Sequence, residues 1–158
     1  MDFLYQDPYP ILKDDTQYKK LTSDYVKVEQ LGDREILVVD PKGLELLAQE
    51  AMDDVSFMLR SAHLQKLRNI IEDPEATDND RFVAYNLLQN AAVAAEGQLP
   101  SCQDTGTAIV VAKKGENVYT GVDDGEWLSK GIYNTYQNKN LRYSQIVPIS
   151  IFEEKNSG

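Results

Sequence analysis

The sequence predicts an α+β fold, in which central helices pack with short antiparallel hairpins and an extended arm precedes them. Three observations lead to this prediction. Apolar residues recur at helical spacing in the middle of the chain, two β-rich runs split by Gly-Asp lie before it, and further short β-rich runs follow it. The chain has 158 residues, 42% of them hydrophobic and 27% charged, which is enough for one domain with a substantial core.

The first forty residues predict an arm followed by a hairpin. Residues 1–22 are rich in Pro, Asp, Tyr and Lys and show no helical or strand period. We therefore expect an extended arm that lies on another surface, and a main region spanning 23–158. The β-rich runs Tyr25–Gln30 and Ile36–Val39 flank Gly32-Asp33, and this pattern predicts a β-hairpin.

Helices are predicted in the middle of the chain and again near its C-terminal part. Their apolar residues recur three or four positions apart, as on the buried face of a helix. Asp and Thr oxygens cap helix starts, Pro fits the first helical position, and Gly or Asp-Pro ends a helix. The expected helices are Leu44–Leu59 after Asp40 and Pro41, Ala62–Glu72, Asp80–Glu96 with several possible caps in Thr77-Asp78-Asn79-Asp80, and one from Asp123 or Asp124 to Gln137 with Trp127, Leu128, Ile132, Tyr133 and Tyr136 facing inward.

Strands are expected around the last helix. Thr107–Ala112 is a continuous apolar run typical of a buried strand. Val118–Thr120 is expected to return beside it after the turn Lys113–Asn117. The tail from Leu141 to Phe152 has strand-like stretches interrupted by Pro148.

Composition limits the function classes. The formal net charge of −10 opposes binding to nucleic acid and to an anionic membrane surface, whereas one or two local arginines suffice to attract a small anion at short range. No apolar run approaches the ~20 residues of a membrane helix, and the first residues lack the basic and hydrophobic blocks of a secretory signal. With a single cysteine, these features predict a cytoplasmic protein without nucleic-acid or membrane partners.

The segment Leu99–Ile109 holds the strongest candidates for chemistry. It contains the only cysteine, Cys102, followed by Gln103 and Asp104. A thiolate is a soft metal ligand, and a carboxylate can transfer protons. One cysteine alone neither closes a disulfide within the chain nor holds an iron–sulfur cluster, and a free cysteine more often packs as a small apolar residue. Either Cys102 is structural, or its partner ligands lie outside these 158 residues.

Two other residues are weaker candidates. The guanidinium of Arg142 can bind a carboxylate through two parallel hydrogen bonds, although a surface arginine is commoner in an acidic protein. His63 is the only histidine, and a histidine side chain can transfer protons, but a lone histidine is more often packed or solvated. The acidic pairs Asp14-Asp15, Asp53-Asp54 and Asp123-Asp124 favour helix caps and solvated faces over a metal site, because adjacent carboxylates point apart.

Several separated motifs resemble the class I, iron–sulfur-dependent fumarate hydratases. The segment Leu99–Ile109 is similar to the signature of that family, and the resemblance covers nearly the whole chain in the same order. The further matching motifs are Tyr5-Gln6-Asp7-Pro8-Tyr9-Pro10, Lys13-Asp14-Asp15-Thr16, Ser56-Phe57-Met58-Leu59-Arg60, Asp73-Pro74-Glu75-Ala76, Tyr133-Asn134-Thr135-Tyr136 and Asn140-Leu141-Arg142-Tyr143-Ser144-Gln145.

The resemblance implies a lyase that reversibly hydrates fumarate to L-malate, a step of the tricarboxylic acid cycle. It implies a [4Fe-4S] cluster held by three cysteines, whose open iron acts as a Lewis acid on the substrate. Cys102 would be the metal-binding residue for this cofactor. Gln103 and Asp104 would line the substrate site, with Asp104 as the catalytic residue, and Arg142 would hold a substrate carboxylate.

The resemblance also implies an incomplete enzyme. The members of that family are much longer, and their other two cluster cysteines and their base lie downstream. We therefore expect 23–158 to be the N-terminal portion of the catalytic region, inactive alone. Its expected partners are a small dicarboxylate substrate, the remainder of the enzyme and, in the full-length protein, a second copy in a homodimer. The alternatives are an L-tartrate dehydratase-type subunit and a non-enzymatic helical interaction domain with a structural Cys102.

Overall fold

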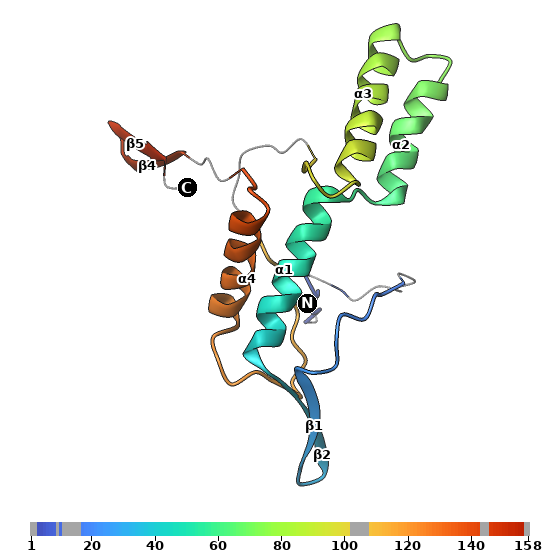
Figure 1. Ribbon diagram of the computed structural model, residues 1–158. Coiled ribbons are helices and arrows are strands. Elements are labelled where there is room, and N and C mark those ends of the chain that lie inside the picture. Colours follow the sequence, from blue (N-terminus) through green and yellow to red (C-terminus); the bar gives the residue numbers. More distant parts are fainter. Residues whose placement is uncertain (1–2, 9, 11–16, 102–107, 143–145, 157–158) are drawn as a thin grey trace.

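The structure, a computed structural model, confirms the α+β class and describes residues 3–8, 10, 17–101, 108–142 and 146–156. Within these residues the elements follow one another as β1 (Val26–Leu31), β2 (Arg34–Val39), α1 (Pro41–Phe57), α2 (Ser61–Glu72), α3 (Asp78–Ala94), β3 (Val118–Tyr119), α4 (Asp124–Asn138), β4 (Ile146–Ser150) and β5 (Glu153–Asn156). Figure 1 shows α1 and α4 side by side, with the α2–α3 pair projecting beyond the end of α1.

A small sheet lies at the start of α1. β1 and β2 form the expected antiparallel hairpin, with Leu31 paired with Arg34 across the turn. Gly32 has a φ of 60° there, a left-handed conformation that costs glycine little because it has no Cβ. β3 joins β2 in parallel to give the strand order β1-β2-β3. The N–H of Leu37 also donates to the carbonyl of Asn117 at 2.8 Å.

Each of the two parallel strands leads into a capped helix. The Asp40 carboxylate accepts a hydrogen bond from the N–H of Lys42 at 2.8 Å and caps α1, with Pro41 at the first position. The Asp123 carboxylate caps α4 by accepting from the N–H of Gly125 at 2.8 Å. Both expected caps are thereby confirmed, and these side chains satisfy amide groups that a helix start leaves unpaired.

α1 and α4 pack in parallel, so their C-terminal ends lie at the same end of the molecule. Gly131 lies where the two helices approach most closely. A Cβ at this position would lie 2.3 Å from the carbonyl oxygen of Glu45 and 2.7 Å from the Cβ of Ala48. The polar contacts advance in step along both helices, from Glu45–Lys130 (2.8 Å) through Gln49–Thr135 (3.2 Å) to Asp53–Lys139 (3.1 Å).

α2 and α3 form a helical hairpin whose second helix begins with a capping box. The hydroxyl of Thr77 accepts from the N–H of Asp80 at 3.2 Å, and the Asp80 carboxylate accepts from the N–H of Thr77 at 2.9 Å. Alanines on α3 let the two helices approach closely. The buried residues of this hairpin are Leu67, Ala84, Ala91 and Ala94.

Three expectations about the second half of the chain are wrong. The described part of the expected buried strand, Ala108–Ala112, is exposed and has no regular structure, whereas Thr107 lies outside the described residues. Val118–Thr120 therefore does not return beside it; residues 118–119 pair in parallel with β2 instead. Tyr133 is 62% exposed because Gly131 and Thr135, one turn apart, form the stripe that faces α1.

The remaining elements agree with the sequence within a few residues. α1 ends at Phe57 and α3 at Ala94, each two residues before the expected end. A strand is confirmed in the tail as β4, but it runs through Pro148, where we expected an interruption, and its antiparallel partner β5 lies beyond Phe152. The register of the pair is irregular between Pro148 and Ser150. No helix in the described stretches is both long and apolar enough to cross a bilayer.

Candidate functional site

Ser101 lies in the segment Leu99–Ile109, here called the cysteine turn, and it is fixed to the end of α1. The N–H of Ser101 donates to the carbonyl of Ser56 at 2.8 Å. Ser56 is only 1% exposed, and its hydroxyl donates to the carbonyl of Met52 at 2.7 Å. A buried helix residue therefore holds the backbone of Ser101, the last described residue before Cys102, at the C-terminal end of α1.

Arg142 follows a second buried anchor, beyond the C-terminal end of α4. Asn140 turns the chain with a φ of 50°, and the N–H of Leu141 donates to the carbonyl of Tyr136 at 3.0 Å. Leu141 is 1% exposed, whereas Arg142 is exposed. The ion pairs between described residues do not include Arg142. The buried leucine thus fixes the backbone from which an exposed guanidinium extends.

The parallel packing of α1 and α4 brings these two anchors to one end of the molecule. The ammonium of Lys139, at the C-terminal end of α4, lies 3.1 Å from a carboxylate oxygen of Asp53 and 5.3 Å from the centroid of the Phe57 ring. Phe57 directly follows Ser56, the residue that holds the cysteine turn. Ser101 and Leu141, 40 positions apart in the sequence, are therefore held at the neighbouring ends of α1 and α4 (Figure 1).

The roles of the predicted site residues remain predictions. Cys102, Gln103 and Asp104 lie outside the described residues, and nothing tests the carboxylate-binding role of Arg142. His63 is exposed on the first turn of α2, in agreement with a solvated histidine.

The donor set of this chain does not by itself fit an iron–sulfur cluster. Across the described ranges, no three His, Cys, Asp or Glu side chains come together as they would around a metal ion. The sequence contains one cysteine, so it provides a single thiolate, whereas such clusters take several. A cluster at Cys102 would need ligands from outside these 158 residues.

The sequence did not predict a polar cluster that joins the turn before β3 to α4. The ammonium of Lys114 donates to Oδ2 of Asp124 at 2.5 Å, and the buried hydroxyl of Thr120 donates to Oδ1 at 2.5 Å. The Lys114 ammonium and then the Thr120 hydroxyl lower the pKa of Asp124 below its ordinary value. The only sequence signal was the pair of adjacent aspartates, of which Asp123 caps the helix and Asp124 binds Lys114.

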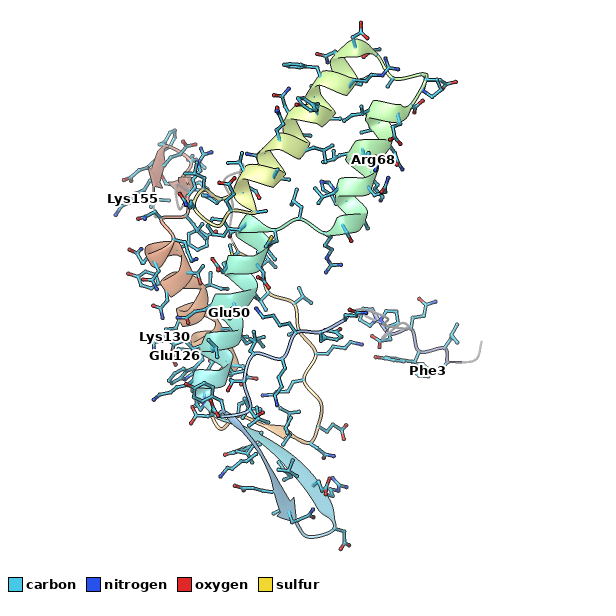
Figure 2. All side chains as sticks on the ribbon, turned by 45° about the vertical axis from the view of Figure 1, so that its right-hand side comes forward. Phe3, Glu50, Arg68, Glu126, Lys130 and Lys155 are labelled. Carbon is cyan, nitrogen blue, oxygen red and sulfur yellow. The ribbon has the colours of Figure 1, made fainter. Side chains whose placement is uncertain are left out.

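An apolar groove of about 710 Å³, here called the α1 groove, runs along the length of α1. Its other walls come from α4 and from the coil that leads into β3, which Figure 2 shows beside α1. Lys114, Thr120 and Asp124 contribute the polar atoms. The main apolar lining residues are Val39, Leu44, Leu47, Met52, Val55, Ile109, Val110, Leu128 and Ile132.

Known proteins similar to this chain point to one family. The family model described as fumarate hydratase (Fumerase) matches residues 45–158. Over 156 residues, 99% of this chain, the sequence is 54% identical to the anaerobic and 53% identical to the aerobic class I fumarate hydratase of Escherichia coli (strain K12). It is 51% identical over 146 residues to the mitochondrial fumarate hydratase 1 of Leishmania major, which covers 91% of this chain. The chain spans about 28% of the length of the two E. coli relatives and 27% of the L. major relative.

Proposed function

Because this chain belongs to the fumarate hydratase family, we propose that it is the N-terminal part of a class I enzyme that reversibly hydrates fumarate to L-malate. The observation that carries the proposal is the 54% identity to a class I fumarate hydratase over 99% of the chain. That match includes both the cysteine turn and the segment around Arg142. The relatives that match in this way are named fumarate hydratases, which favours fumarate over tartrate as the substrate.

Cys102 is proposed as one thiolate ligand of a [4Fe-4S] cluster whose other ligands come from the rest of the enzyme. The hydrogen bond between the N–H of Ser101 and the carbonyl of Ser56 supports this role, because it holds the backbone of the residue that precedes Cys102 in the sequence. A metal ligand needs such support, since residues around a metal site orient its ligands. The resemblance further supports a cytoplasmic homodimer that acts in the tricarboxylic acid cycle.

Arg142 is proposed to bind a carboxylate of the substrate, while Gln103 and Asp104 line the site and Asp104 takes part in proton transfer. Fumarate and malate are dianions, whereas this chain carries a net charge of −10, so the average field opposes their approach. A local cation must therefore provide the attraction. An exposed guanidinium beside a buried Leu141 suits this task, because its planar fork matches a carboxylate.

The proposal is tested in the full-length polypeptide that contains these residues. Cys102→Ser should remove both the visible absorbance of the cluster and the hydration of fumarate. Arg142→Lys keeps the charge but loses the paired hydrogen bonds, so it should retain the absorbance. A lost charge-assisted hydrogen bond is worth ~1.5–3 kcal/mol, so kcat/KM should fall by roughly one to two orders of magnitude.

Arg68→Lys is the matched control. Arg68 lies on the outer α2–α3 hairpin (Figure 2), where its guanidinium pairs with Glu72 at 2.9 Å. This variant should keep wild-type kcat/KM in both directions. An Arg142→Lys enzyme of wild-type efficiency, or one whose activity falls only because it unfolds, would show that the arginine has no role in substrate binding.

A further inference from the structure

A run of apolar residues lies exposed beside α1. Ala108–Ala112 contains five consecutive apolar residues, of which Ile109, Val110 and Val111 are 83%, 53% and 66% exposed. β-branched residues of this kind favour strands, and continuous apolar runs are typical of strands covered on both faces. In this chain the run has no strand partner among the described residues. A contiguous exposed apolar surface of this kind marks an interaction site.

The surroundings of this run are fixed in place. Upstream of it, Ser101 is bound to the carbonyl of Ser56 at the C-terminal end of α1. Two residues downstream of it, the ammonium of Lys114 is bound at 2.5 Å to the carboxylate of Asp124 at the start of α4. The exposed run is therefore held at a defined place along α1. A surface that binds another segment needs such a fixed position.

The face of α1 next to this run is also incompletely covered. Leu47 and Val55 line the α1 groove, and they are 51% and 64% exposed. Ile109 and Val110 line the same groove from the other side. A space of about 710 Å³ separates these two apolar walls. The helix face and the exposed run together form one apolar surface.

We propose that the α1 groove and Ala108–Ala112 are the docking surface for the part of the same polypeptide that follows residue 158. This inference rests on the proposed function, because it takes the chain as the N-terminal part of a longer enzyme. The relatives are long enough to provide this occupant, since the chain spans only about 28% of their length. A second copy of these 158 residues is disfavoured, because two chains that each carry a formal net charge of −10 repel one another.

Hydrogen exchange tests the proposal by comparing the 158-residue chain with the full-length polypeptide. Strand pairing and burial protect amide groups, so the amides of Ala108–Ala112 should exchange at least about tenfold more slowly in the full-length polypeptide. Equal exchange in the two proteins would overturn the proposal. Protection in the 158-residue chain that rises with its concentration would also overturn it, because the surface would then bind a second copy.

A matched pair of valine variants tests whether the exposed run Ala108–Ala112 is part of the docking surface. Val111 and Val28 are 66% and 61% exposed, and neither lines the α1 groove. Val111 belongs to the exposed run Ala108–Ala112, whereas Val28 lies on β1. Val111→Ser should reduce the protection of Ala108–Ala112 about tenfold in the full-length polypeptide, as expected for the loss of a buried aliphatic side chain. Val28→Ser should leave this protection unchanged. Equal effects of the two variants would contradict the proposed surface.

Fumarate hydration by the same full-length polypeptide is measured separately. Protection without hydration would overturn the proposed function and leave the docking surface supported. Hydration without protection would overturn the docking surface alone.

Discussion

At the scale of single residues, one glycine sets the separation of α1 and α4. A Cβ on Gly131 would lie 2.3 Å from the carbonyl oxygen of Glu45, which belongs to backbone that cannot move away cheaply. Gly131→Ala should therefore force the helices apart and lower the free energy of unfolding by about 1–3 kcal/mol, as overpacking does. Denaturant unfolding followed by circular dichroism measures this change.

Ser129→Ala is the control for that substitution. Ser129 is exposed on the same helix, and surface substitutions usually change stability by less than about 0.5 kcal/mol. Equal free energies of unfolding for the two variants would contradict the close contact between α1 and α4 at Gly131.

The carboxylate of Asp124 should make stability depend on pH in acid. The hydrogen bonds from Lys114 and then Thr120 lower its pKa from the ordinary value of 3.8 in the folded protein. The unfolded chain therefore binds this proton more readily, and the stabilisation is present above that value and is lost as the pH falls through the lower folded pKa. Unfolding free energies measured across this acid range should fall less steeply for Asp124→Asn. The control is Asp33→Asn in the β1–β2 turn, whose free energy of unfolding should fall with pH as that of the wild type does. Identical curves for all three proteins would contradict the prediction.

At the scale of elements, the capping box of α3 stabilises the start of the outer helical hairpin. Thr77→Ala removes the hydroxyl that accepts from the N–H of Asp80 at 3.2 Å. Loss of an N-cap side chain costs about 1 kcal/mol, so the free energy of unfolding should fall by this amount. Amides in the first turn of α3 should also exchange faster. Asn79→Ala, an exposed neighbour without a capping role, should show neither effect; unchanged exchange in Thr77→Ala would argue against the cap.

Capping and periodicity made most elements predictable from the sequence. Asp40 caps a helix as expected, and the structure selects Thr77 and Asp123 from the neighbouring candidates that the sequence offered. These caps were predictable because a cap acts within three residues of its own backbone. The prediction of a buried strand failed at Ala108–Ala112, because strand pairing depends on distant residues and not on near neighbours. An apolar run indicates that a segment can be buried in a sheet, but the partner that buries it can lie anywhere in the polypeptide.

At the scale of the whole molecule, the 158-residue chain alone should not hydrate fumarate. It has one cysteine, so it lacks the further thiolates that an iron–sulfur cluster takes. Anaerobic reconstitution with iron and sulfide, followed by visible absorbance and fumarate consumption, measures the outcome. The full-length polypeptide treated in the same way is the control. Robust turnover by the 158-residue chain would contradict its assignment as part of a larger active site.

The sequence by itself determined the α+β class, the hairpin, the helix starts and the motifs that nominate Cys102 and Arg142. These features depend on residue types and on interactions within a few positions of the chain. Only the tertiary structure decided that α1 and α4 run in parallel, and that Ser101 and Leu141 are held at neighbouring helix ends. The physical reason is that this arrangement depends on contacts between distant residues, such as Lys130 with Glu45, 85 positions apart, and no local pattern encodes which distant surfaces fit together.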